Sequence, residues 1–423
     1  MKYKKTVLPN GMRIITIPLK EGQSAIGMVL VETGSDFESK EQNGLSHFLE
    51  HMCFKATTNR TGDQIKLELD GMGAESNAFT SNEFTGYYAK ASKDKISKVI
   101  DLVSDMYINP IFPQKDIDIE RGVIIEEINM YDEMPQRTVS RMWNEMLYPN
   151  TSAGRRVIGT KENILKFNQN DFQKYHKLHY TPVKTVFIIA GNIDEKEVTI
   201  QLKNIFSPIE VSKNVKRPKT KTSQATPNLS IQYRKGDQTH LVLGFRSFDL
   251  YNKKNYALKI AATILGQGFS SRLFTKMRDE LGLCYYVSAG TYSYSDRGVF
   301  AVRSGVTNSR ALESVQVLLS EFKKIRDEEI SPKELKKAKD FIIGNFAIGL
   351  ETSEDVADYF GFQELLKEEI LYPRDYIKKI KAITVEEVQK VLKEIMKDKN
   401  LNLAIIGPFK KDKEKEFKKL LKI

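Results

Sequence analysis

Apolar runs recur at matching places in the two halves of the chain. Each half opens with two runs that predict strands: RIITIPL at 13–19, AIGMVLVETGS at 25–35, LSIQYR at 229–234 and THLVLGFRSF at 239–248. A helix is predicted after each pair, from about Gly44 and from about Asn255. Each half also ends in an apolar strand, at 187–194 and at 403–408. This shared order predicts a tandem duplication of one α+β unit.

The segment between the two copies differs in composition. Residues 207–229 are rich in Pro, Lys, Thr and Ser and have no apolar period, which predicts an exposed linker. Amphipathic helices, for example at 94–110 and 310–328, are expected between the strands of each half. We therefore expect an N-terminal domain at 1–210, a linker at 211–228 and a C-terminal domain at 229–423.

Composition places the chain among globular proteins. It has 423 residues, of which 40% are hydrophobic and 29% charged, and this excludes collagen-like, disulfide-scaffold and wholly disordered classes. Two cysteines cannot make a disulfide framework, so a reducing compartment is expected. No apolar stretch is long enough for a membrane span, and the N-terminal residues lack the apolar core of a signal peptide. A cytoplasmic location is the resulting expectation.

The net charge of +11 raises the question of an anionic partner. Most lysines are scattered among Glu and Asp on polar helix faces, which is typical of a solvated surface. Basic residues are not interleaved with aromatic residues as they are in a base-stacking surface. We therefore expect neither a nucleic-acid nor a membrane partner, and only salt-dependent nucleic-acid binding would revive the first alternative.

The strongest chemical signal is the sequence HFLEH. His47 and His51 are four residues apart in a segment with helical apolar spacing, so both imidazoles project from one face and can bind one metal ion. Glu50 lies near the same face without being placed as a ligand. A carboxylate beside a metal-bound water can take its proton as a general base.

A catalytic zinc site needs a third protein ligand. Glu120 and Glu127 are seven residues apart and so share one face of a predicted helix, and either can be this ligand. His176 and His179 have helical spacing but no carboxylate near them in sequence, so polar or packing roles are favoured. Cys53 is expected to be a small core residue.

These segments resemble the pitrilysin and mitochondrial processing peptidase family, in its short form of about 400 residues. The likeness covers nearly the whole chain. It includes TVLPNGMRIIT, GLSHFLEHMCFKAT, GAESNAFTSNEFTGYY, ERGVIIEEINMYDE, YTPVKTVFIIAGNID and SSRLFTKMRDELGLCYYV. H-x-x-E-H is the inverted form of the H-E-x-x-H zinc-peptidase motif. The resemblance implies an α+β fold with two homologous domains, each a mostly antiparallel sheet flanked by helices, that dimerise into a clam-shell chamber.

The resemblance also implies roles for individual residues. His47, His51 and Glu127 match the zinc ligands, Glu50 the catalytic base, and Glu120 a carboxylate that orients a ligand. Asn77 matches the edge strand that holds an extended substrate by main-chain hydrogen bonds. Arg278 and Tyr285 match a pair that contacts the substrate.

The expected protein is thus a zinc-dependent endopeptidase with one Zn²⁺ per chain, acting on short or unfolded peptides in an enclosed chamber. A homodimer is expected because the chain keeps the full catalytic set. Two alternatives stay open, a heterodimer with a zinc-less paralogue and a non-catalytic subunit that binds substrate. The natural substrate and cleavage preference stay open, as does whether Arg278 and Tyr285 serve their own chain's zinc or a partner's.

Overall fold

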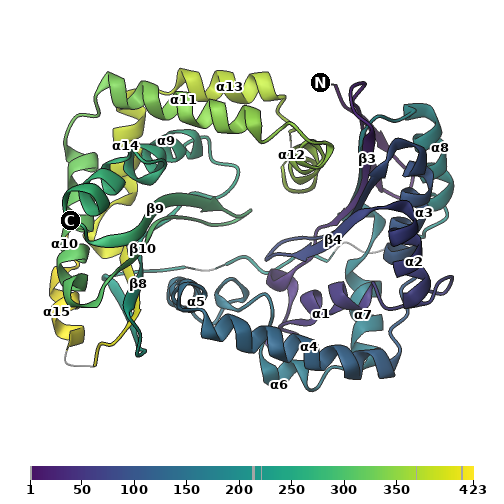
Figure 1. The fold of residues 1–423 in the computed structure, drawn as a ribbon, viewed down its shortest axis with the longest axis horizontal. Coiled ribbons are helices and arrows are strands. Elements are labelled where there is room, and N and C mark those ends of the chain that lie inside the picture. Colours follow the sequence, from purple (N-terminus) through teal and green to yellow (C-terminus); the bar gives the residue numbers. More distant parts are fainter. Residues whose placement is uncertain (1, 212–214, 221, 368, 411–412) are drawn as a thin grey trace. The chain divides into compact units, whose positions relative to one another are not determined.

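The protein divides into two compact units. A computed structural model describes residues 2–211, 215–220, 222–367, 369–410 and 413–423 (Figure 1). Unit 1 comprises Met1–Asn129, Arg155–Pro218 and Ile348–Ile370. Unit 2 comprises Met130–Gly154, Lys219–Ala347 and Leu371–Ile423. The two units are described one after the other.

Unit 1 is built on a sheet with the strand order β1-β2-β6-β3-β5-β4. Its strands are β1 (Lys4–Val7), β2 (Arg13–Pro18), β3 (Ser24–Val31), β4 (Glu75–Thr80), β5 (Thr85–Ser92) and β6 (Thr185–Gly191). Only β2 and β6 pair in parallel, and the other neighbours are antiparallel. Every residue of β6 is buried, as its continuous apolar sequence requires. The other end of the order leaves β4 as an edge strand.

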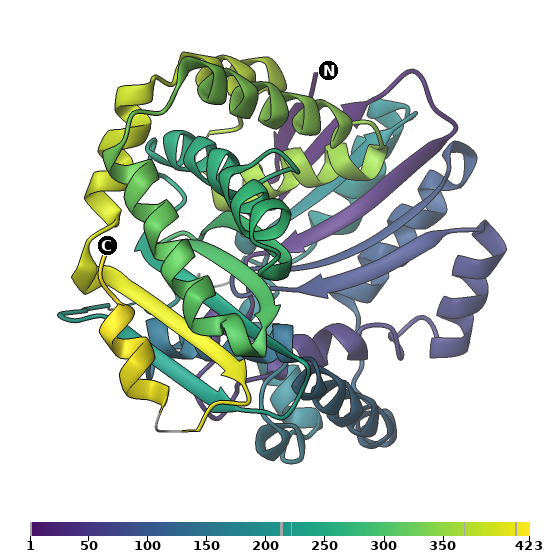
Figure 2. The same cartoon turned by 60° about the vertical axis from the view of Figure 1, so that its left-hand side comes forward.

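Unit 2 repeats this topology. Its sheet has the order β7-β11-β8-β10-β9, formed by β7 (Asn228–Tyr233), β8 (Gln238–Ser247), β9 (Cys284–Ser293), β10 (Gly298–Thr307) and β11 (Leu401–Gly407). β7 and β11 are parallel and the other pairs antiparallel, as in β2-β6-β3-β5-β4. Figure 2 shows β11, in yellow, among the strands of this sheet. The expected α+β class with two similar, mostly antiparallel sheets is confirmed.

Each sheet is covered by a helix from the other half of the chain. The helix α12 (Ser353–Leu366) packs its buried residues Val356 and Phe360 on the sheet of unit 1. The helix α5 (Pro135–Leu147) packs Val139 and Trp143 on the sheet of unit 2. The compact units therefore differ from the contiguous ranges 1–210 and 229–423, because these apolar helix faces cover the sheet that lies beyond the linker.

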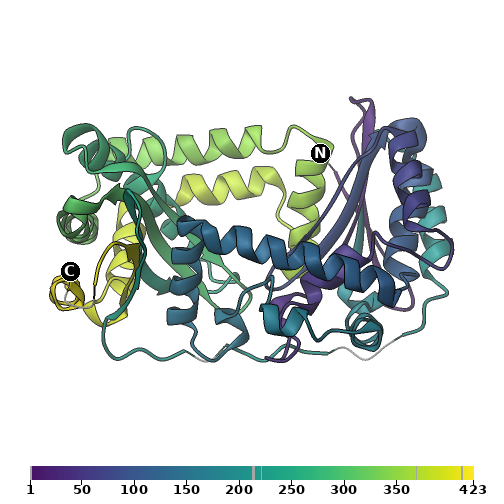
Figure 3. The ribbon, with the colours of Figure 1, turned by 60° about the horizontal axis from the view of Figure 1, so that its bottom comes forward.

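The remaining helices flank the two sheets. Those of unit 1 are α1 (Leu45–Met52), α2 (Gly62–Met72), α3 (Ile96–Ile108), α4 (Gln114–Glu133), α6 (Lys161–Ile164), α7 (Gln169–His179) and α8 (Glu195–Phe206), with the last residues of α4 in unit 2. Those of unit 2 are α9 (Asn255–Gly266), α10 (Ala311–Asp327), α11 (Pro332–Ile348), α13 (Pro373–Ala382), α14 (Val385–Ile395) and α15 (Glu414–Leu420). Figure 3 displays the long helix α4 along its length. Among the described residues, every helix is too short or too polar to be a membrane span.

A buried arginine ties the linker to unit 1. Arg217 is largely buried, and its guanidinium lies 3.3 Å from the Asp36 carboxylate and 2.9 Å from that of Glu83. Residues 212–214 and 221 of the expected linker lie outside the described residues. The described linker residues before Lys219 therefore belong to unit 1, to which the ion pairs of Arg217 attach them.

Candidate metal centre

The helix α1 starts at a backbone position that only glycine fits. Gly44 has a φ of 103°, and a Cβ there would lie 2.9 Å from the Cα of Gly159. The buried Glu38 carboxylate accepts hydrogen bonds from the N–H groups of Gly44 (2.9 Å) and Ser46 (2.7 Å). Burial raises the pKa of Glu38 even though these bonds favour its charged form. Glu38 therefore fixes the start of this helix.

The two histidines lie on one side of α1. The apolar residues Phe48, Leu49 and Met52 are buried in unit 1, and they fix the rotation of the helix. The imidazole rings of His47 and His51 are 4.7 Å apart, centroid to centroid, and remain partly exposed. Burial, together with the neighbouring His51, lowers the pKa of His47 to about 4. His47 is therefore neutral at neutral pH, as a metal ligand must be.

Glu127 of α4 faces both imidazoles. Its Oε2 lies 3.7 Å from Nε2 of His47 and 3.9 Å from Nε2 of His51. One ligand atom from each of the three side chains lies within 4.8 Å of the other two, and among the described residues no other set of His, Cys, Asp and Glu has this arrangement. Of the two glutamates that the spacing left open, Glu127 is the one placed to be the third ligand.

Glu120 contacts the other nitrogen of His51. Its Oε1 lies 2.9 Å from Nδ1, and because a carboxylate only accepts, Nδ1 carries the proton; in the neutral ring Nε2 then keeps the lone pair, on the side of Glu127. Burial alone would lower the pKa of His51, but the bond to Glu120 and the nearby carboxylates outweigh it and raise the pKa. The other oxygen of Glu120 pairs with the Lys55 ammonium.

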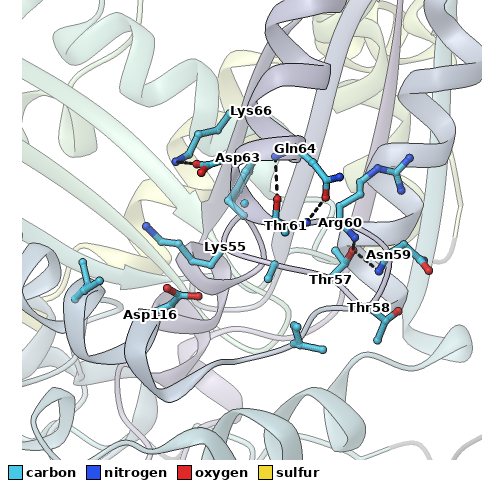
Figure 4. Close-up of a pocket in the computed structure, with 15 residues that line it drawn as sticks. Lys55, Thr57, Thr58, Asn59, Arg60, Thr61, Asp63, Gln64, Lys66 and Asp116 are labelled. Carbon is cyan, nitrogen blue, oxygen red and sulfur yellow. Dashed lines mark hydrogen bonds and ion pairs between the residues drawn. The ribbon is translucent and has the colours of Figure 1, made fainter.

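Lys55 connects the centre to an open cavity of about 540 Å³. The cavity is lined by residues 54–64 and Lys66, by Ile111 just before α4, and by Asp116 and Ile119 near the start of α4 (Figure 4). Lys55 and His51 together lower the pKa of Glu120, against the opposing effect of burial. Glu120 is therefore held as a carboxylate by two cationic or proton-donating groups.

Glu50 points into unit 1 and is 9% exposed. Its Oε2 accepts a hydrogen bond of 2.5 Å from the hydroxyl of Thr80, the last residue of β4. Burial raises the pKa of Glu50, while the Thr80 hydroxyl acts in the opposite direction. The edge strand β4 is thus tied directly to the carboxylate beside the two histidines.

Asn77 lies on the exposed part of β4. The strand pairs with β5 on one side only, so its other edge is open to an added strand. The side-chain oxygen of Asn77 accepts a hydrogen bond of 2.9 Å from the N–H of Ala78. An extended chain that bonds to this N–H has to displace the Asn77 side chain.

Arg278 and Tyr285 lie together in unit 2. Arg278 belongs to the π-helix η5 (Phe274–Glu280) and Tyr285 to the start of β9. The Arg278 guanidinium donates to the carbonyl of Tyr285 and lies 5.5 Å from the centroid of its ring. Both side chains are exposed, Tyr285 by 70%, so their donors face solvent within this unit.

The other histidines and Cys53 have packing roles. His176 is partly buried and bonds through Nε2 to the carbonyl of Tyr107 (2.9 Å), and His179 and His240 are buried. Cys53 is fully buried, and burial raises the pKa of its thiol to about 12. None of these four residues joins His47, His51 and Glu127.

Family models match most of the chain. Residues 13–161 match the model described as insulinase (peptidase family M16), and residues 166–342 match the peptidase M16 inactive domain. A protein of Mycobacterium leprae, named an uncharacterized zinc protease, is 31% identical over 96% of this chain and 92% of its own. The chain belongs to peptidase family M16. The family resemblance found in the sequence is thereby confirmed.

Two further relatives and one solved structure align over nearly the whole chain. An uncharacterized zinc protease of Streptomyces coelicolor is 30% identical over 96% of this chain and 90% of its own. The zinc protease YmxG of Bacillus subtilis is 29% identical over 96% and 98%. A crystal structure of a Helicobacter pylori protease aligns with a TM-score of 0.90 at 23% identity, covering 96% of this chain and 99% of that one. The last comparison shows the fold alone.

Replacing Glu120 tests its hold on His51. Glu120→Gln removes the charge that fixes the proton on Nδ1 of His51. We expect Zn²⁺ affinity to fall about 10- to 100-fold, which is the usual effect of removing a group that hydrogen-bonds to a metal ligand. The measurement is competition with a chromophoric chelator. Glu126→Gln is the matched control, because Glu126 is exposed on the same helix. Equal affinities of the two variants would contradict the assignment.

Proposed function

We propose that the protein is a zinc-dependent endopeptidase that hydrolyses short or unfolded peptides. The observation that carries the proposal is the convergence of His47, His51 and Glu127, with the Glu50 carboxylate beside them. Relatives of the same length are named zinc proteases, which supports the same metal and the same reaction class.

The donor set fits a zinc ion. Tetrahedral ligands at about 2.1 Å from zinc lie about 3.4 Å from one another. The Glu127 oxygen lies 3.7 and 3.9 Å from the two imidazole nitrogens, a few tenths of an ångström beyond this spacing, and all three ligand atoms lie within 4.8 Å of one another. Two neutral imidazoles and one carboxylate are also the ligand types that zinc prefers at catalytic sites.

In this proposal Glu50 is the general base and acid. Bound zinc would polarise the scissile carbonyl and acidify a water molecule. Glu50 takes the proton of the attacking water and passes it to the amine of the leaving peptide. Its raised pKa makes the carboxylate a better proton acceptor, and Thr80 occupies Oε2, which leaves Oε1 for the transfer.

The peptide is held as an added strand. We assign Asn77 and the open edge of β4 to this role, because main-chain hydrogen bonds recognise an extended peptide whatever its side chains are. A folded protein cannot offer such a strand, so short or unfolded chains are the expected substrates. Arg278 and Tyr285 are assigned to substrate carbonyls, since both present exposed donors.

We also propose a homodimer that encloses the site in a chamber. Each chain carries its own metal set, so identical chains suffice. Equilibrium sedimentation is expected to give twice the chain mass of 48.4 kDa. A single-chain mass, with activity restored only by a zinc-less paralogue, would replace the homodimer by the heterodimer alternative.

The non-catalytic binding subunit is the second candidate. The match of residues 166–342 to a domain described as inactive favours it. That match covers neither His47, His51 nor Glu127, which lie in the other matched region. A subunit that only binds peptides has no need of this set, so we favour the enzyme.

Two substitutions separate the base from the ligands. Glu50→Gln keeps all three ligands, so it is expected to retain zinc. Hydrolysis of an unstructured quenched peptide is expected to fall by at least about 100-fold, because general-base catalysis contributes about 10²- to 10⁴-fold to a rate. His51→Ala is expected to lose zinc and activity together. Zinc content is measured by elemental analysis and hydrolysis by fluorescence, with a chelator as control.

Wild-type hydrolysis by the Glu50→Gln variant would remove Glu50 from the base role. Zinc-loaded wild-type protein that cleaves no peptide in a mixed library would favour the binding subunit instead. The two outcomes are distinct, because the first concerns one residue and the second the reaction.

Thr80 is expected to position Glu50. Thr80→Val keeps the side-chain shape but removes the hydroxyl that donates to Oε2. We expect kcat to fall about 10-fold at unchanged KM, because this fold-change corresponds to the free energy of one hydrogen bond to a charged group. Thr80→Ser restores the donor and is expected to restore kcat. A fall that is the same in both variants, or that appears in KM, would assign Thr80 to packing or strand binding.

A further inference from the structure

Unit 2 contains a small cavity with aromatic and cationic walls. Its volume is about 140 Å³, and it lies where α5 covers β9 and β10. The walls that matter here are Trp143, Tyr148, Tyr292, Tyr294, Arg297 and Arg303. None of these residues has a part in the proposed hydrolysis, so the cavity needs its own explanation.

Arg297 is a structural cation of this cavity. It is 5% exposed, and its guanidinium stacks on the ring of Tyr294 (4.1 Å to the centroid) and on that of Tyr148 (5.4 Å). Nη1 lies 3.1 Å from the carboxylate of Asp296, which balances the charge. These contacts within unit 2 therefore explain the position of the Arg297 side chain.

Arg303 differs from Arg297 in lacking a counter-ion. Arg303 lies on the same face of β10 as Val299 and Ala301, which pack against α5. Its guanidinium therefore lies at the end of this apolar face. Nη1 donates to the Tyr292 hydroxyl at 2.8 Å, and the guanidinium lies 4.9 Å from the centre of that ring. Among the described residues, no carboxylate forms an ion pair with Arg303, and its buried Nε has no acceptor.

The Arg303 guanidinium is reachable from solvent, and its single hydrogen bond to Tyr292 leaves other N–H donors that can bind an anion. A carboxylate fits best, because its planar oxygens match the guanidinium fork. The Tyr and Trp rings offer apolar contact to the carbon stem that carries the carboxylate. The volume of about 140 Å³ admits one side chain or one terminal residue and excludes a folded domain.

We propose that this cavity binds a carboxylate of a peptide, with Arg303 as its ion-pair partner. The peptide is identified as the substrate only on the basis of the proposed function. The carboxylate comes from an acidic side chain or from the C-terminus, and both sources offer the same chemistry. Arg303 then favours peptides that carry such a carboxylate over neutral ones.

The chain offers a built-in reporter for this binding. Trp143 is the single tryptophan of the sequence, and it lines the cavity at 2% exposure. Its emission is followed in the full-length Glu50→Gln protein, so that no turnover occurs. The probes are acetyl-Ala-Glu-amide, acetyl-Ala-Ala with a free carboxylate, and acetyl-Ala-Gln-amide as the neutral control.

We expect a saturable change in emission with one or both carboxylate peptides and none with the Gln peptide. The comparison of the first two probes identifies the source of the carboxylate. Arg303→Met is expected to weaken the binding at least 10-fold, and Arg141→Met, on α5 and outside the cavity, is the charge-matched control. Circular dichroism checks that the variants keep their fold.

Equal responses to the Glu and Gln peptides, no saturable response, or unchanged affinity in Arg303→Met would overturn the proposal. Inorganic phosphate that competes as strongly as the peptides would overturn the assignment to a carboxylate. Because the readout is binding without turnover, failure here leaves the peptidase proposal intact. A protein without hydrolytic activity can equally still show this binding.

Discussion

The site depends on the fixed approach of α1 and α4, two helices that are far apart in sequence. Each is anchored by apolar residues, Phe48 and Leu49 on α1 and Ile124 and Ile128 on α4. Their polar groups therefore converge because burial fixes the position of both helices. A site arranged in this way loses little conformational entropy when an ion binds. The buried Glu38 cap has the same effect, since it fixes where α1 begins.

Three buried glutamates lie around this pair of helices, and their surroundings shift their pKa values in different directions. Burial raises the pKa of Glu38 and Glu50, whose hydrogen-bond partners are backbone N–H groups in one case and a hydroxyl in the other. Glu120 has two strong partners, His51 and Lys55, and these lower its pKa instead. One carboxylate with a raised pKa and one with a lowered pKa thus lie at the same small site, as the proposed roles of Glu50 and Glu120 require.

The sequence carries the local part of this arrangement. The i, i+4 spacing predicted that His47 and His51 share a face, and the apolar runs predicted β2, β3 and β6 of one sheet and β7, β8 and β11 of the other. The seven-residue spacing could not choose between Glu120 and Glu127, because the choice depends on how α4 is rotated against α1. Thr80, Lys55 and Glu38 were missed for a similar reason, since each acts through a contact outside any helical period. The exchange of α5 and α12 was missed because an apolar helix face does not encode which sheet it covers.

The duplicated topology places corresponding helices in the two units, and only one of them carries the histidines. α9 follows β8 as α1 follows β3, the corresponding strand of the shared order, and the buried fraction is the same, six of eight residues in α1 and nine of twelve in α9. The two helices differ in the residues at their less buried positions, which are His47 and His51 in α1 but Asn255, Tyr256 and Lys259 in α9. Unit 2 instead exposes Arg278 and Tyr285, which follow α9 in the chain. The two copies have thus kept one strand order while diverging in the side chains that this helix exposes, and those side chains decide whether a metal can be bound.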